Sequence, residues 1–208
     1  YANQGEVCLC GSRIYVQRPV YEQFIDGLVE KIRTHVKVGD PADPATTLGA
    51  LVSQQHLRRV MGFVDSARED GATFHCGGKR PEGLPEHLAE GAFLEPTLIS
   101  GLGPDCKSQR QEIFGPMVSV TPFDTEEEVL ALANDTRYGL SATVWTTNLG
   151  SAHRMSAALE AGIVWVNSWF LRDLRSAFGG MKNSGIGREG GVHSLEFYSE
   201  LKNVCIKL

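Results

Sequence analysis

The feature that most constrains the fold of this chain is its alternation of strand-like and helix-like segments. Residues 12–17 alternate as a strand does, and after Pro19 apolar residues recur every four positions up to Val36. Ser53 is suited to cap a second helix, which would keep its apolar residues on one face and end at Gly71. This order predicts an α/β fold in which helices cover both faces of a mostly parallel sheet.

The alternation continues to the end of the chain. Thr125 and Glu128 form a capping box, in which each side chain satisfies a free backbone donor, so a helix should run from there to about Asn134. Residues 77–91, rich in Gly, Pro and charge, are predicted to form a surface loop. The other expected strands are residues 72–76, 93–99, 117–123, 141–147, 163–167 and 204–208, and the other expected helices are 152–161 and 194–201.

Length and charge narrow the function. A chain of 208 residues supports one large domain, or one domain with an appendage. The 20 basic and 25 acidic side chains give a net charge of −5, which argues against nucleic acid as the main partner. The longest apolar run, residues 162–166, is far shorter than the roughly 18 residues that a membrane span needs. We therefore expect a soluble protein with a small-molecule substrate.

Cysteine and histidine spacing predicts neither disulfides nor a metal site. The five cysteines are odd in number and irregularly spaced, which favours a reducing, cytoplasmic setting. Cys8 and Cys10 lack the second ligand pair of a zinc site, and the six histidines show no ligand spacing, which predicts surface or satisfied core positions for them. The chain begins at Tyr1 without Met or a signal peptide, so we expect it to start inside a longer reading frame.

Six of the 23 glycines fall between Gly179 and Gly191, and residues 185–190 match the pattern G-x-G-x-x-G. A dinucleotide fingerprint also needs a strand before it, a helix after it and an acidic residue about 20 positions on, within a βαβ unit. Only 18 residues follow Gly190, so that unit does not fit. We instead expect an irregular loop with demanding backbone geometry.

Cys8 is the candidate nucleophile. A cysteine in a reducing protein is more often a small buried hydrophobe than a reactive group. Here, however, Gly5 lies three residues before the thiol, where backbone freedom could bring amide donors and substrate close to the sulfur. A thiolate is the strongest common side-chain nucleophile near neutral pH and adds to carbonyl carbon.

Three segments resemble motifs of the aldehyde dehydrogenase superfamily. Residues 3–8, Asn-Gln-Gly-Glu-Val-Cys, resemble its N-x-G-Q-x-C segment, residues 112–116 match EIFGP, and residues 177–185 resemble PFGG-x-K-x-SG. The motifs stand in the family's order and approximate spacing, and the likeness covers essentially the whole chain. Glu6 replaces the usual glutamine and Ala177 the usual proline, so the local geometry there is open.

The resemblance implies roles for single residues. Cys8 would attack an aldehyde to give a thiohemiacetal, with its backbone N–H as one oxyanion donor; hydride would leave to nicotinamide, and water would cleave the thioester. Glu112 would bind the nicotinamide ribose hydroxyls, Phe114 would lie beside that ribose, and Phe178 would line the substrate tunnel. Without the motifs, a solvated glutamate and core phenylalanines would be the default interpretation. The implied cofactor is NAD, with NADP left open.

The resemblance also implies a domain organisation. Residues 1–180 would form the catalytic, thiol-bearing domain, and residues 181–208 a loop, helix and strand that pair across a homodimer or homotetramer interface. The family's cofactor domain, its general-base glutamate and its oxyanion asparagine normally precede the cysteine and are not in this sequence. The isolated chain is therefore expected to be inactive.

Residues 167–175 (Asn-Ser-Trp-Phe-Leu-Arg-Asp-Leu-Arg) resemble the branch of the family that acts on 2-aminomuconate 6-semialdehyde and 2-hydroxymuconate semialdehyde. Such substrates carry a carboxylate, which a guanidinium can bind with two parallel hydrogen bonds. Arg172 is the first candidate for this contact and Arg175 the second, with Trp169 lining the substrate entrance. The alternative is that Asp173 pairs with one arginine and both lie at the rim.

The sequence thus predicts the catalytic portion of an NAD-dependent aldehyde dehydrogenase that oxidises a carboxylated semialdehyde. One alternative is a truncated, non-catalytic domain that keeps only its fold and association surface. Another is a thiol esterase or acyl transferase that uses Cys8 without nicotinamide, although Glu112 and Phe114 in their motif argue against it.

Overall fold

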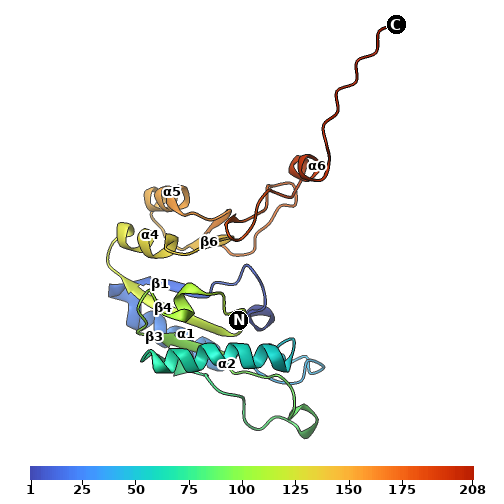
Figure 1. Ribbon diagram of the computed structural model, residues 1–208. Helices are drawn as coiled ribbons and strands as arrows, with labels where there is room; N and C mark the ends of the chain where they lie inside the picture. Colours follow the sequence, from blue (N-terminus) through green and yellow to red (C-terminus); the bar gives the residue numbers. More distant parts are fainter. The chain divides into compact units, whose positions relative to one another are not determined.

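The computed structural model describes all 208 residues, which form two compact units: unit 1, Tyr1–Leu132, and unit 2, Ala133–Leu208 (Figure 1). The main elements of unit 1 are β1 Arg13–Gln17, α1 Tyr21–His35, α2 Gln54–Glu69, β2 Thr73–Cys76, β3 Thr97–Ser100, α3 Lys107–Arg110, β4 Met117–Phe123 and α4 Glu126–Asn134, whose end lies in unit 2. Short 3-10 turns occupy Ala2–Gly5, Arg18–Val20 and Glu86–Leu88.

The sheet of unit 1 has four strands in the order β1-β4-β3-β2. β4 pairs in parallel with both β1 and β3, while β2 is an antiparallel edge strand. Because parallel neighbours start at the same edge of a sheet, the segments that lead into β1 and β4 meet there. The sheet is therefore mostly parallel, as predicted, with one antiparallel edge.

Helices cover both faces of this sheet. On one face Val60 and Phe63 of α2 pack in a cluster with Ile99 of β3. On the other face Ile25 of α1 packs in a cluster with Leu98. Adjacent residues of β3 thus enter different cores, as the twofold side-chain period of a strand requires, and the predicted α/β layering is confirmed.

Two predicted helix caps form. Ser53 caps α2 by accepting a hydrogen bond from the His56 N–H at 3.1 Å. Thr125 accepts from the Glu128 N–H at 3.2 Å, while the Glu128 carboxylate accepts from the N–H of Asp124, one residue before the cap. The capping box therefore forms with its return bond shifted by one residue.

Unit 2 contains β5 Tyr138–Gly139, β6 Ser141–Val144, α5 Leu149–Ala158, β7 Ile163–Val166, β8 Met181–Lys182 and α6 Val192–Tyr198. β6 and β7 form a parallel pair, and β5 and β8 an antiparallel one. The G-x-G-x-x-G segment is an irregular loop between β8 and α6, with positive φ at Gly185, Gly187 and Gly190. It belongs to no βαβ unit.

Several predicted bounds are wrong. The strand expected at 93–99 begins only at Thr97, and the one expected at 141–147 ends at Val144. α5 begins at Leu149, three residues before the expected start, because the Asn148 side chain caps it by accepting from the Ser151 N–H. α6 begins two residues before its expected start and ends at Tyr198.

Residues 199–208 form no helix or strand (Figure 1). The strand expected at 204–208 is absent, since a strand needs a neighbouring backbone to pair with and this segment has none. Its pairing across an oligomer interface, and the division at residues 180 and 181, stay predictions. No helix has the length and hydropathy of a bilayer-spanning segment, and no group of three or more His, Cys, Asp or Glu residues is placed to hold a metal ion.

Candidate active site

The segments that carry Cys8 and Phe114 meet at one edge of the unit 1 sheet. Cys8 lies five residues before β1, and Phe114 lies three residues before β4. These strands are parallel neighbours, so their amino ends lie together. The topology therefore brings two of the sequence motifs, separated by about a hundred residues, to one place.

The two segments touch through backbone. Gly5 has φ +73°, and a Cβ at this position would lie 2.2 Å from the carbonyl oxygen of Gly115. Asn3 and Gln4, with φ of 48° and 58°, also adopt the left-handed region. Asn3 and Gln4, which are not glycine, incur a free-energy cost in this region that surrounding contacts must offset. The glycine ahead of the thiol is thus required by a close approach to the EIFGP segment.

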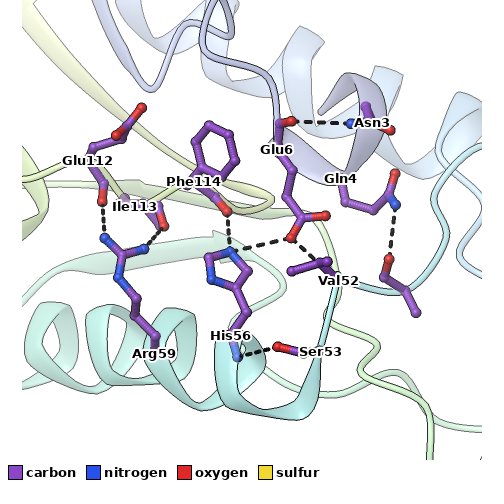
Figure 2. A network of polar contacts seen from close by, with 11 residues as sticks. Asn3, Gln4, Glu6, Val52, Ser53, His56, Arg59, Glu112, Ile113 and Phe114 are labelled. Carbon is purple, nitrogen blue, oxygen red and sulfur yellow. Dashed lines mark hydrogen bonds and ion pairs between the residues drawn. The ribbon is translucent and has the colours of Figure 1, made fainter. Parts of the chain in front are cut away.

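Polar contacts hold the cysteine segment to the loop that precedes α2 (Figure 2). The Gln4 side chain donates to the carbonyl of Ala50 at 2.9 Å, and the Glu6 carboxylate accepts from the Val52 N–H at 3.1 Å. Asn3 closes the turn by donating from its side chain to the Glu6 carbonyl at 3.2 Å. These bonds fix the strained backbone that leads to Cys8.

His56, in the first turn of α2, links this segment to the EIFGP loop. Its Nε2 lies 2.6 Å from the carbonyl oxygen of Phe114 and 3.4 Å from Glu6 Oε1 (Figure 2). The rings of His56 and Phe114 meet edge to face with centroids 6.4 Å apart. Phe114 itself has φ +57°, an uncommon value for a bulky residue, and the bond to its carbonyl helps to hold it.

Arg59, one turn further along α2, fixes the same loop. Its Nη2 donates to the Glu112 carbonyl and its Nη1 to the Ile113 carbonyl, both at 2.6 Å. The guanidinium thus satisfies two backbone carbonyls and does not bind the Glu112 carboxylate. That carboxylate is exposed and points away from Arg59 (Figure 2). An exposed carboxylate on an anchored backbone can accept two hydrogen bonds from a vicinal diol.

The two neighbouring thiols differ in availability. Cys8 is exposed, whereas Cys10 is half-buried and its Sγ donates to the Ala2 carbonyl at 3.6 Å. Burial raises the pKa of the Cys10 thiol, which lowers its thiolate fraction near neutral pH. All five cysteines are free. Cys8 is therefore the better candidate nucleophile of the pair.

In unit 2 the structure brings Arg172 and Phe178 together and adds Glu189. The Arg172 guanidinium lies 4.1 Å from the centroid of the Phe178 ring, and its Nη2 lies 3.0 Å from Glu189 Oε1. Phe178 and Glu189 are joined by two backbone hydrogen bonds of 2.8 Å. The ring and the carboxylate that hold Arg172 are thus fixed to each other.

The other predicted substrate residues, Arg175 and Trp169, have contacts with their sequence neighbours. Arg175 is paired with Asp173 at 2.6 Å, and its side chain is 88% exposed. The Trp169 ring packs against Phe170 with centroids 5.0 Å apart. The alternative expected from the sequence, in which Asp173 pairs with one arginine at the rim, therefore applies to Arg175 and not to Arg172.

Sequence reasoning missed His56, Arg59 and Glu189. Nothing local in the sequence indicates that His56 faces Phe114, 58 residues away. The three-residue spacing of His56 and Arg59 places both on one face of α2, which was the available signal. Glu189 lies within the G-x-G-x-x-G pattern, where the glycines carry the stronger signal.

The structure combines an α/β fold with an exposed thiol on a segment held against the EIFGP segment, and comparison with known proteins gives the class. The chain belongs to the aldehyde dehydrogenase family, whose sequence profile matches residues 1–204. It is 52% identical over its whole length to a 2-aminomuconic 6-semialdehyde dehydrogenase from Pseudomonas sp and 50% identical to a 2-aminomuconic semialdehyde dehydrogenase from Danio rerio. It spans 42% of the length of each of these relatives.

Solved structures show the same fold. HpcC from Thermus thermophilus matches with a TM-score of 0.92 and 42% identity, over 97% of this chain and 39% of that one. Betaine aldehyde dehydrogenase from Staphylococcus aureus, solved in complex with NAD+, matches with a TM-score of 0.89 and 38% identity, over 94% of this chain and 38% of that one. The predicted family and fold class are confirmed.

Proposed function

We propose that this chain is the thiol-bearing portion of an NAD-dependent dehydrogenase that oxidises a carboxylated semialdehyde to the acid. The observation that carries the proposal is the exposed thiol of Cys8 on a segment held by Glu6 and Gly5 against the loop of Glu112 and Phe114. Family membership and the names of the similar relatives support the reaction class.

In the proposed reaction the Cys8 thiolate adds to the aldehyde carbon and forms a C–S bond. The carbonyl oxygen becomes an oxyanion, which the backbone N–H of Cys8 stabilises. Loss of hydride from that carbon leaves a thioester on Cys8, and water cleaves it to the acid and the free thiol. The acid–base groups for the water are not assigned to any residue of this chain.

Glu112 and Phe114 fit the nicotinamide ribose end of NAD. The exposed Glu112 carboxylate offers two acceptor oxygens, and Arg59 anchors the backbone that carries it. The Phe114 ring is half-buried beside it and can pack against a ribose. When bound, the nicotinamide supplies the acceptor for the hydride. NAD is proposed over NADP because similar proteins were solved with NAD+.

Arg172 is proposed to bind the substrate carboxylate, with Phe178 and Trp169 lining the path to it. The Arg172 side chain is 34% exposed, so part of its guanidinium edge is open to a ligand while Nη2 faces Glu189. Stacking on Phe178 fixes the plane of the fork, which favours bidentate recognition. Relatives named for 2-aminomuconic and 2-hydroxymuconic semialdehydes support a substrate of this type.

Replacing the thiol tests the reaction. In the full-length protein that contains this chain, Cys8→Ala should lower kcat by at least about 10³-fold, because the covalent adduct cannot form. NAD binding, measured by calorimetry, should stay within about twofold. Cys10→Ala, which removes the neighbouring half-buried thiol, is the matched control and should lower kcat far less. Substantial turnover in Cys8→Ala would overturn the assignment.

Replacing the arginine tests the substrate class. Arg172→Ala should raise KM for a carboxylated semialdehyde by about 10- to 100-fold, the worth of lost charge-assisted hydrogen bonds, and change KM for an aliphatic aldehyde little. Arg175→Ala is the control and should have a much smaller effect. Equal effects of Arg172→Ala on both aldehydes would remove this residue from the substrate site.

The assembly is proposed to be a homodimer or homotetramer in the cytoplasm. Five free thiols fit a reducing compartment, and the apolar side chains of residues 201–208 are exposed and available for pairing.

The 208-residue chain by itself is proposed to keep its fold without turnover. NADH production by that chain alone would refute this last point.

A further inference from the structure

We propose that Glu6 and His56 are positioning residues that couple the placement of the Cys8 segment to that of the Glu112–Phe114 loop. Neither side chain is assigned to touch substrate or cofactor. The Glu6 side chain extends from the cysteine segment to the Val52 N–H, and the His56 side chain contacts the Phe114 carbonyl. The two side chains also contact each other (Figure 2). The inference rests on the proposed function, in which these two segments carry the nucleophile and the ribose site.

Glu6 connects the cysteine segment to α2. It lies two residues before Cys8, its side chain is 11% exposed, and its Oε1 accepts from the Val52 N–H at 3.1 Å. Burying a carboxylate costs free energy unless hydrogen bonds or charge compensate it, so these partners constrain where Glu6 can lie. The carboxylate therefore fixes the backbone just ahead of the thiol.

His56 carries the connection to the second segment. Its side chain is 15% exposed, and its Nε2 faces two acceptors, the Phe114 carbonyl oxygen at 2.6 Å and Glu6 Oε1 at 3.4 Å. A carbonyl oxygen can only accept, so Nε2 carries the hydrogen and donates it to the Phe114 carbonyl. The same nitrogen lies within ion-pair distance of the Glu6 carboxylate, and His56 thus contacts both the Phe114 backbone and the cysteine segment.

The tied backbone is strained on both sides. Phe114 has φ +57°, and Asn3 and Gln4, which precede the thiol, have φ of 48° and 58°. Such conformations persist only where the surroundings determine them. Because Glu6 and His56 bond directly to the segments that hold these residues, loss of either side chain should let both segments relax.

Glutamine at position 6 is the informative variant. Its side-chain oxygen can still accept from the Val52 N–H and still lie beside His56 Nε2, while the negative charge is lost. Alanine removes both contacts. If position 6 acts through hydrogen-bond geometry, Glu6→Gln keeps the function that Glu6→Ala loses.

The kinetic test uses the full-length protein that contains this chain, with NAD and a carboxylated semialdehyde. Glu6→Ala should lower kcat about tenfold, His56→Ala should raise KM for NAD about tenfold, and Glu6→Gln should stay within about threefold of wild type. In kcat/KM for NAD, the double alanine variant should lose less than the product of the two single losses, because both residues act in one network. Exposed Glu22→Ala and His153→Ala are the matched controls.

Equal losses in Glu6→Ala and Glu6→Gln, or fully multiplicative losses in the double variant, would overturn the proposal. Loss of kcat alone in every variant, with KM for NAD unchanged, would do so too, since partial unfolding only removes active enzyme. Thermal unfolding of each variant shows directly whether it is folded.

A second measurement separates this proposal from the proposed function. Amide hydrogen exchange in the full-length protein that contains this chain should quicken at residues 3–8 in His56→Ala and at residues 112–116 in Glu6→Ala, several-fold in each. If the wild-type protein has no dehydrogenase activity but this reciprocal exchange occurs, the proposed function fails and the coupling stands. If each variant quickens exchange only next to its own site, the coupling fails.

Discussion

Units 1 and 2 differ sharply in how they treat apolar side chains. Of the 25 buried hydrophobic residues, 22 lie in unit 1, and unit 2 has only Ala152, Met155 and Trp165. Of the 19 exposed large hydrophobic residues, three lie in unit 1 and 16 in unit 2. Unit 1 closes two cores around its own sheet, whereas unit 2 presents apolar surface of the kind that marks interaction sites.

The difference matches the division of proposed roles. The proposed nucleophile segment and the Glu112–Phe114 loop, proposed to bind the ribose, require positions fixed to fractions of an ångström. Both segments lead into strands of the packed sheet of unit 1. The substrate arginine and the apolar tail stand in unit 2, on loops and short elements. The residues proposed for substrate specificity and assembly would thus lie in unit 2, which buries fewer apolar side chains than unit 1.

The largest expected effect comes from one substitution made in both units. Leu57 of α2 is 4% exposed, and Leu195 of α6 is 70% exposed. Leu57→Ala should lower the free energy of unfolding by about 2–5 kcal/mol, because it removes buried methyl groups and leaves a cavity. Leu195→Ala should stay within about 0.5 kcal/mol of wild type. Denaturant titration of the 208-residue chain checks both, and similar losses would break the comparison.

Two glycine substitutions sharpen the comparison of the units, because unit 2 also contains a position where an added side chain would clash. A Cβ on Gly162 of unit 2 would lie 1.7 Å from the Gly179 carbonyl oxygen, whereas a Cβ on Gly27, within α1, meets nothing within 4 Å. Gly162→Ala should destabilise by about 1–3 kcal/mol through overpacking. Gly27→Ala should stabilise by about 0.5–1 kcal/mol through helix propensity.

Denaturant titration measures both variants, and we expect the midpoint denaturant concentration to fall in Gly162→Ala and to rise in Gly27→Ala. A neutral Gly162→Ala would mean that the segments of residues 162 and 179 move apart at little cost. Loss of stability in Gly27→Ala would mean that α1 meets a neighbour at that face.

Local sequence signals predicted unit 1 better than unit 2, for a physical reason. β4 was predicted to its exact bounds, because its strand pattern is followed directly by the Thr125 cap. α2 starts after Ser53 as predicted, since a cap acts within one turn. In unit 2 the predicted start of α5 is wrong, because Asn148 caps this helix ahead of the first clear apolar repeat.

The candidate site was only half predictable. The motifs identified Cys8, Glu112 and Phe114, but the bonds that hold their segments join residues about 50 positions apart, such as Glu6 and His56. No local periodicity encodes such pairs. The strand expected at residues 204–208 is absent for a related reason, since no backbone of this chain lies beside the segment to pair with it.

The smallest expected effect concerns two exposed ion pairs, one in each unit. Arg18 holds Asp124 with bonds of 2.7 and 2.9 Å, and it lowers the pKa of that carboxyl from its usual 3.8, mainly by hydrogen bonding. Hydrogen bonds from Arg175 lower the pKa of Asp173 in the same direction. The pairs differ in sequence separation: the first joins residues 106 positions apart, the second only two.

That separation decides which pair affects stability. A lowered folded-state pKa adds to the free energy of unfolding above the unfolded value, and the gain is lost as pH falls through the folded one. Asp124 meets Arg18 only in the folded chain, so its contribution should fade as pH drops below 3.8. Asp173 and Arg175 can meet in the unfolded chain too, so their pKa difference between states is small.

Asp124→Asn should therefore make the unfolding midpoint fall less steeply with decreasing pH, and Asp173→Asn should leave the slope unchanged. Thermal unfolding followed at low ionic strength checks this, and about 1 M salt should remove most of the difference, since both pairs are exposed. An equal change of slope in both variants would mean that Asp173 and Arg175 meet only in the folded chain. The segment of residues 173–175 would then be held in place by the fold, although its side chains are exposed.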